Sequence, residues 1–133
     1  MTLATSDGHG RPWASPVWFA TTDYRELVWA SKRDARHSRN LSSRPEVGIV
    51  IFDSTQPPST GEAVYLSAHA EQVPESELER CLEIYAAASE QQGLDRWGLA
   101  QVQSPARHRL YWAIATEYYV LSSGDERMSV VMP

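Results

Sequence analysis

The feature of the sequence that most constrains the fold is a short apolar run, Val47–Phe52, which reads VGIVIF. The run is rich in β-branched side chains and follows Pro45, and it is too short to be typical of a helix. Because its apolar residues are continuous rather than alternating, the pattern predicts a central strand that is buried on both faces. We therefore expect the chain to fold around a sheet that contains this segment.

Further strand-like segments lie on both sides of this run and are separated by turn signals. The Asp-Gly pair in Ser6–Gly10 favours a turn, because glycine adopts a positive φ at no steric cost. Thr22–Arg25 is expected to be a second turn, and the Pro-Pro pair within Ser54–Gly61 requires a loop. Besides Val47–Phe52, the expected strands are residues 2–5, residues 12–21, Glu26–Ser31, Ala63–Val73 and Arg109–Leu121.

One of these segments contains a proline that limits its place in the sheet. Pro16 lies within residues 12–21 and has no N–H to donate, which predicts an edge strand or a bulge. The alternation of side chains in this segment places four residues on one face: Trp13, Ser15, Val17 and Phe19.

Two segments have helical patterns. Ser76 and Glu79 form a capping box that predicts a helix start, and Gly93 is expected to end that helix. The second helix is expected at about residues 33–42. Six strands with a few short helices predict a mainly β fold, a small six-stranded antiparallel barrel with flanking helices, in a single domain over residues 1–133.

The composition excludes several classes of protein. A chain of 133 residues, 42% of them apolar, is long enough for one domain with a core. No apolar run approaches the roughly 18 residues of a membrane-spanning helix. The N-terminus has no secretory signal pattern and Cys81 is the single cysteine, so we expect a cytoplasmic protein without membrane association. The four histidines lack metal-ligand spacing, so no metal site is expected.

The positive charges are concentrated in one segment of an otherwise acidic chain. Five of the 12 basic residues lie between Lys32 and Arg44, although acidic residues total 17. A nucleic-acid-binding protein needs a broad positive surface, so this distribution favours a local site for a small anion instead. Ser31 is expected to cap the basic helix, and Arg36 could hold a phosphate by two hydrogen bonds. The alternative is a solvated basic helix that pairs with acidic parts of the chain.

The order of these segments resembles the pyridoxamine 5′-phosphate oxidase-like flavin-binding split barrels. The resemblance covers about residues 2–90 and rests on an ordered set of motifs rather than on one signature. The motifs are LAT, a turn, GRPWASPVWF, LVWAS, the basic helix, RPEV, the apolar strand and VYLSAHAEQV. It implies a dimeric six-stranded split barrel in which FMN, or a deazaflavin cofactor in some branches, lies between the two subunits.

The resemblance also implies a set of cofactor-binding residues. The segment that runs along the flavin ring matches Ser15, Pro16, Val17 and Trp18; the phosphate side matches Ala30, Ser31, Arg36 and His37; an aromatic residue near the flavin matches Tyr119. The chain departs from the family pattern at three positions. His37 replaces a lysine and would gain charge beside phosphate, Ala63 replaces a glutamine, and Ala20 replaces the lysine that binds the phosphorylated substrate of the vitamin B6 oxidase.

We therefore expect an FMN-dependent oxidoreductase whose reaction differs from vitamin B6 oxidation and whose substrate is a small molecule. The resemblance names no general acid or base in this chain. Two alternatives are a deazaflavin-dependent reductase and a non-catalytic protein that binds a flavin or haem.

Overall fold

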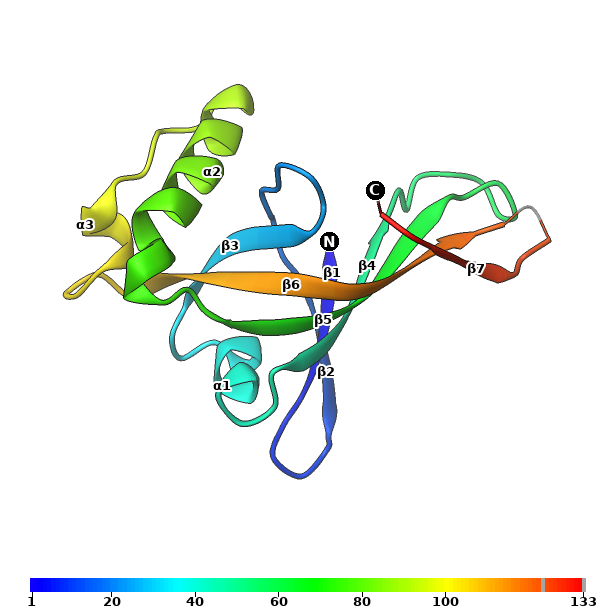
Figure 1. Ribbon diagram of the computed structural model, residues 1–133, viewed down its shortest axis with the longest axis horizontal. Helices are drawn as coiled ribbons and strands as arrows, with labels where there is room; N and C mark the ends of the chain where they lie inside the picture. The colour runs from blue at the N-terminus through cyan, green and yellow to red at the C-terminus, as the bar shows by residue number, and fades with distance from the viewer. Residues whose placement is uncertain (123, 133) are drawn as a thin grey trace.

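The computed structural model describes residues 1–122 and 124–132, and the elements within them are mainly strands (Figure 1). In chain order they are β1 (Thr2–Ser6), β2 (Pro12–Pro16), β3 (Glu26–Lys32), α1 (Arg36–Ser43), β4 (Glu46–Phe52), β5 (Ala63–Gln72), the 3₁₀ turn η1 (Glu75–Glu77), α2 (Leu78–Gln91), α3 (Leu99–Val102), β6 (His108–Leu121) and β7 (Arg127–Val130).

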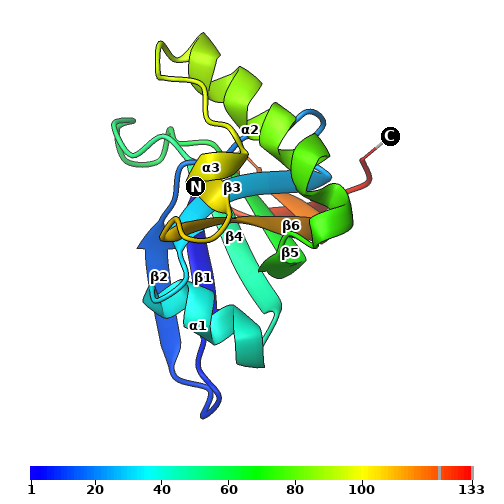
Figure 2. The same cartoon turned by 90° about the vertical axis from the view of Figure 1, so that its left-hand side faces the viewer.

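All the strands belong to one antiparallel sheet. Its order is β2-β1-β4-β5-β6-β3, and β7 pairs with the second half of β6 while β3 pairs with the first half. The sheet curls into a half barrel (Figures 1 and 2), so the predicted mainly β antiparallel fold is confirmed. The strands β2 and β3 are the two edges of this path, and we call the gap between these edges the seam.

The concave side of the sheet encloses the larger apolar core, which we call the inner core. Strand alternation directs Leu27 and Trp29 of β3 into it, and the Trp29 ring stacks on Tyr111 of β6 with a centroid separation of 5.9 Å. Helix α1 packs against β1, β2 and β5 at this side of the molecule. The buried members of the inner core are Leu3, Leu27, Trp29, Leu41, Val47, Ile49, Leu66, Ala68, Ala70, Tyr111 and Ala113.

A second, smaller core lies on the opposite face of β3 and β6, and we call it the outer core. Figure 2 shows α2 and α3 on one side of this strand pair and α1 on the other. Cys81 is buried here as the sequence predicted, and burial raises the pKa of its thiol to about 12. The buried members of the outer core are Val28, Val73, Cys81, Leu82, Val102 and Leu110.

The predicted strand over residues 12–21 is wrong beyond Pro16, where β2 ends. Pro16 cannot donate to a ladder, and the next residue, Val17, donates its N–H to the carbonyl of Met1 instead. The chain then crosses toward β3, where Ala20 and Val28 exchange two backbone hydrogen bonds of 2.8 Å.

The prediction that Val47–Phe52 is buried on both faces is also wrong. Strand β4 is central, between β1 and β5, and Val47 and Ile49 are buried in the inner core. Gly48 is exposed, however, and 53% of the Phe52 surface is exposed. The reason is that α2 and α3 cover the convex side only over β3 and the start of β6. The convex surface of β4, β5 and the second half of β6, which we call the open face, has no covering layer among the described residues.

Both helix starts differ from the sequence prediction. Helix α1 begins at Arg36 rather than near residue 33, and Ala35 occupies its N-cap without a side-chain cap. Ser31 does not cap this helix because it lies within β3. Ser76 lies inside η1, and α2 begins at Leu78 without a capping box. The expected end at Gly93 is confirmed: it follows the helix with a φ of +76°.

Three elements were not predicted: η1, α3 and β7, each short and without a long periodic pattern. None of the helices in the described residues is long and apolar enough to cross a membrane.

Candidate functional site

A chain of side-chain hydrogen bonds crosses the seam between the two edge strands. Ser15 of β2 and Ser31 of β3 are both buried, and the imidazole of His37, from α1, lies between them. The His37 Nε2 atom is 2.7 Å from Ser31 Oγ, and Nδ1 is 3.2 Å from Ser15 Oγ. The side chain of α1 therefore joins two strands that share no backbone ladder.

The environment of His37 favours the neutral imidazole. Burial lowers the pKa of His37 below its ordinary value, because the charged form loses solvation. A neutral imidazole has one donor and one acceptor nitrogen, and the serine hydroxyls can satisfy both. The lowered pKa favours the neutral form of His37, whereas the sequence led us to expect the charged form. The charged form would need a bound phosphate beside it.

Arg36 is the first residue of α1 and lies beside this chain of hydrogen bonds. Its guanidinium carbon is 4.4 Å from the centroid of the Trp13 ring, a cation–π distance, and the side chain is exposed. No side chain caps the N-terminus of α1. An exposed guanidinium beside an uncapped helix start is suited to a phosphate or carboxylate.

A second buried contact fixes α1 against the β1–β2 hairpin. Asn40 donates from Nδ2 to Thr5 Oγ1 over 3.0 Å, and Thr5 Oγ1 donates to the carbonyl of Trp13 over 3.4 Å. Thr5 and Asn40 were not among the predicted site residues. Asn40 was missed because a polar residue in a short basic helix is expected at the surface. Their contact positions the helix that carries Arg36 and His37.

The structure brings only part of the predicted cofactor set together. Ser15, Ser31, His37 and Arg36 gather at one end of the seam, from two strands and one helix. Pro16 follows Ser15 directly as an exposed residue at the end of β2.

The other predicted residues lie elsewhere. Val17 packs on the inner core and Ala30 on the outer core. Trp18 is 42% exposed and meets the edge of Tyr85 from α2, with ring centroids 5.2 Å apart. Tyr119 pairs with Tyr65 across β5 and β6, near β7.

Comparison with known proteins gives a family and a set of similar folds. The family model described as pyridoxamine 5′-phosphate oxidase matches residues 1–121. Among curated protein sequences, none is significantly similar to the chain.

Among solved structures, a haem-binding protein from Mycobacterium smegmatis aligns with a TM-score of 0.73 and 21% identity over 98% of this chain and 51% of that chain. HutZ, the haem storage protein from Vibrio cholerae, aligns with a TM-score of 0.69 and 25% identity over 90% of this chain and 83% of that chain. An FAD-binding protein from Mesorhizobium loti aligns with a TM-score of 0.67 and 15% identity over 90% of this chain and 82% of that chain. The chain thus spans about half the length of the mycobacterial protein.

Proposed function

The chain belongs to the pyridoxamine 5′-phosphate oxidase family, and we propose that it is a flavin-dependent oxidoreductase that holds the phosphate of FMN at the start of α1. The observation that carries the proposal is the convergence of Arg36, His37, Ser15 and Ser31 at one end of the seam. The bound flavin would supply the electron-transfer chemistry, and the chain would bind and orient it.

The residues at this end of the seam fit a phosphate. Arg36 is exposed and can turn from the Trp13 ring toward an anion, next to the uncapped start of α1. His37 already uses both ring nitrogens, so we assign it to fixing the position of α1 rather than to direct contact with phosphate. Arg36 then supplies most of the charge for the phosphate, by a two-pronged contact.

We assign the flavin ring to the segment Ser15–Trp18, which begins at the phosphate site with Ser15. Pro16 and Trp18 are exposed there, and Trp18 is held from behind by the edge of Tyr85. An aromatic ring in this position offers a flat wall for the ring of a flavin.

We also propose that two copies of the chain form the functional unit. Exposed apolar side chains lie on the open face and at its border, namely Phe52 of β4 at 53% exposure and Ile114 in the middle of β6 at 39%. A second copy seated there would cover them. Light scattering tests this assembly: we expect twice the monomer mass of 14.9 kDa, and Phe52→Asp should lower it.

The reaction that we propose differs from vitamin B6 oxidation. The position of the family's substrate-binding lysine is occupied by Ala20, which is 2% exposed and bonded to Val28 in a backbone bridge. A side chain at this position faces packed protein and carries no charge for a substrate phosphate. A different small molecule is therefore the substrate in this proposal.

The first experiment is reconstitution of the purified chain with FMN and with riboflavin, which lacks the phosphate. Arg36→Ala should weaken FMN binding by about tenfold or more, because a hydrogen bond to a charged group contributes about 1.5–3 kcal/mol. Riboflavin binding should not change. Arg44→Ala is the matched control, because Arg44 lies just after the same helix and reaches the carbonyl of Gly8 instead. Equal losses in the two variants would contradict the phosphate site.

Haem binding without catalysis is a second candidate, and one contact favours it. His69 Nδ1 is 3.3 Å from Glu46 Oε1, and Nε2 has no hydrogen-bond partner in the described part of the chain. A carboxylate behind an exposed histidine is the usual support of a metal-ligating imidazole. Titration with haem would show a Soret shift that His69→Ala abolishes.

Absorption spectra of the chain with bound cofactor separate flavin from deazaflavin. Bleaching of the cofactor band by a reduced nicotinamide separates an oxidoreductase from a binding protein.

A further inference from the structure

Three arginines from two separate segments surround a hollow next to the start of α1. Arg33 comes from the link between β3 and α1, and Arg107 and Arg109 come from the loop before β6 and its first residues. The two segments are tied by a backbone bond in which Arg33 N–H donates to the carbonyl of Arg107 over 3.4 Å. The hollow measures about 290 Å³.

The arginine hollow has an excess of positive charge. Asp34 is the one carboxylate that lines it, and its contact with Arg107 is loose at 3.8 Å, with both side chains 71% exposed. Arg109 is held more firmly, because its Nη1 donates to the carbonyls of Ala106 and His108 over 2.7 and 2.6 Å. Like charges that line one hollow are unfavourable unless an anion neutralises them, and three guanidinium groups against one carboxylate match a phosphate dianion.

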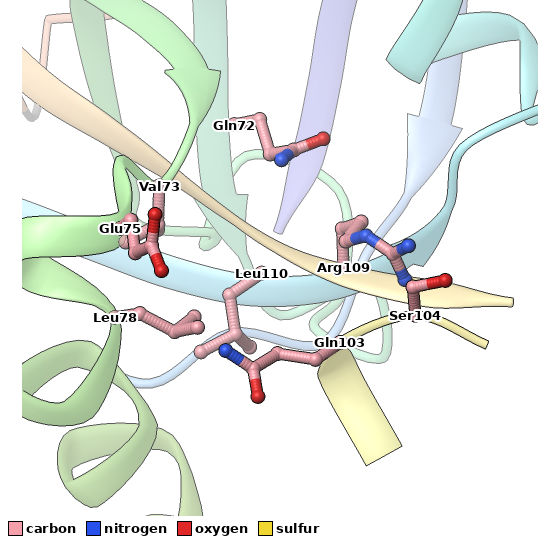
Figure 3. A pocket seen from close by; sticks show the side chains of 8 residues that line it. All are labelled: Gln72, Val73, Glu75, Leu78, Gln103, Ser104, Arg109 and Leu110. Carbon is pink, nitrogen blue, oxygen red and sulfur yellow. The ribbon is translucent and has the colours of Figure 1, made fainter. Parts of the chain in front are cut away.

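A second hollow of about 360 Å³ adjoins the first and shares Arg109 and Ser104 with it (Figure 3). Its apolar side chains are Val73, Leu78 and Leu110; Val73 and Leu110 are buried in the outer core, whereas Leu78 is half-buried. The exposed part of Leu78 is therefore the apolar surface of this second hollow on which a flat ring can lie.

The polar groups of the second hollow are arranged with opposite charges at its two ends. Arg109 and Ser104 lie at one end and Glu75 at the other, the amide of Gln103 lies between them, and Gln72 lies on the other side of β6 (Figure 3). The amides can bond either donors or acceptors, whereas the Glu75 carboxylate accepts only. The carboxylate disfavours a second phosphate and suits an amino group on the ring.

We propose that the two hollows together form a site for a mononucleotide with an amino-bearing base, separate from the flavin site at the seam. The phosphate lies among Arg33, Arg107 and Arg109, the base lies over Leu78 beside Gln103, and its amino group donates to Glu75. The two hollows together have a volume in the range, roughly 300–1,000 Å³, of small-molecule sites.

Calorimetric titration of the purified full chain with AMP, adenosine, inorganic phosphate and IMP tests the site. AMP should bind at least tenfold more tightly than adenosine or phosphate, because only AMP fills both hollows. IMP, which lacks the amino group, should bind more weakly than AMP, and Glu75→Gln should remove that difference. AMP that binds no better than inorganic phosphate, or that does not bind, would overturn the proposal.

Matched arginine variants locate the phosphate. Arg109→Gln and Arg107→Gln should each weaken AMP binding at least tenfold and leave adenosine unchanged. Arg107 is largely exposed, so its variant should fold even if loss of the Arg109 contacts perturbs the loop. Arg127→Gln removes the same charge in β7, where Arg127 lies over Tyr65, and should have no effect. Equal effects of the Arg107 and Arg127 variants would refute the site.

A competition with FMN completes the test: AMP affinity should be unchanged at saturating FMN, and competitive displacement would show that the hollows belong to the flavin site.

Discussion

The inner and outer cores of this molecule share strands β3 and β6 but differ in how they treat polar groups. The inner core is bordered by buried polar side chains, among them Ser15, Ser31, Ser38 and Asn40. The outer core holds Cys81 and is otherwise apolar at its centre, while its charges lie at the rim, where Arg80 binds Glu26. Both cores bury aromatic or aliphatic side chains against the same two strands.

The difference follows from how each core is closed. Helix α2 lies across the outer core, and its backbone bonds are satisfied within the helix, so apolar side chains suffice. The inner core is open at the seam, where β2 and β3 form no ladder. Side chains of α1 take the place of backbone bonds there, which brings Ser15, Ser31 and His37 to one point. The incomplete sheet is thus the origin of the candidate site.

The largest expected effect is the loss of an inner-core aromatic. Trp29 is fully buried and stacks on Tyr111, so Trp29→Ala should reduce the free energy of unfolding by about 3–5 kcal/mol. Trp112→Ala, at the half-buried margin of the outer core, should cost less. Urea denaturation of both variants measures the difference, and equal losses would contradict the expected effect of the deeper burial of Trp29.

The next largest effect concerns the buried polar contact that holds α1. Asn40→Ala leaves Thr5 Oγ1 without its donor in a buried position, which should cost about 1–3 kcal/mol in the free energy of unfolding. The double variant Asn40→Ala with Thr5→Val should recover part of that loss, because both polar groups are then removed together. Additive losses in the urea denaturation cycle would contradict a direct bond between these residues.

The rim of the outer core should respond less. Arg80 binds Glu26 and Glu77 at 2.9 and 2.7 Å, but its side chain is 48% exposed. Arg80→Gln should therefore reduce the free energy of unfolding by only about 0.2–1 kcal/mol, and the loss should shrink at high salt. A loss as large as that of Asn40→Ala would remove the contrast between the two cores.

The smallest effect is a dependence of stability on pH at the seam. Burial lowers the pKa of His37 in the folded chain, whereas the unfolded chain keeps the ordinary value of about 6.5. Below about pH 6.5 the unfolded chain binds more protons at this residue, so stability falls as the pH falls toward the folded pKa. Urea denaturation of His37→Gln should show a shallower decline over this range than the parent chain. His9→Gln, in the exposed hairpin turn, is the control and should keep the parent slope.

The positions of most strands along the chain were predictable because they depend on local patterns. The β-branched run at Val47–Phe52, the turn at Ser6–Gly10 and the alternation of Ala63–Val73 each report a preference of a short segment of backbone. The helix starts were less predictable. The turn before α2 is the 3₁₀ turn η1, and the start of α1 at Arg36 has no side-chain cap that a pattern could reveal.

The candidate site was also predictable only in part from the sequence. Its charge was visible in the sequence, because the basic residues are neighbours between Lys32 and Arg44. The support from Thr5 and Asn40 was not visible, since those residues are 35 positions apart and meet only in the fold. The arginines of the loop before β6 were also missed, because only the pairing of β3 with β6 brings them beside Arg33.

The sequence by itself determined a mainly β chain with a basic helix after its third strand, since strand and helix preferences and charge are properties of neighbouring residues. Only the tertiary structure decided that β2 and β3 do not pair with each other, that His37 spans them, and that one side of β4 stays uncovered. These outcomes depend on the curl of the sheet and on which strands it brings together. Long-range contacts of this kind are set by packing, which local sequence patterns do not encode.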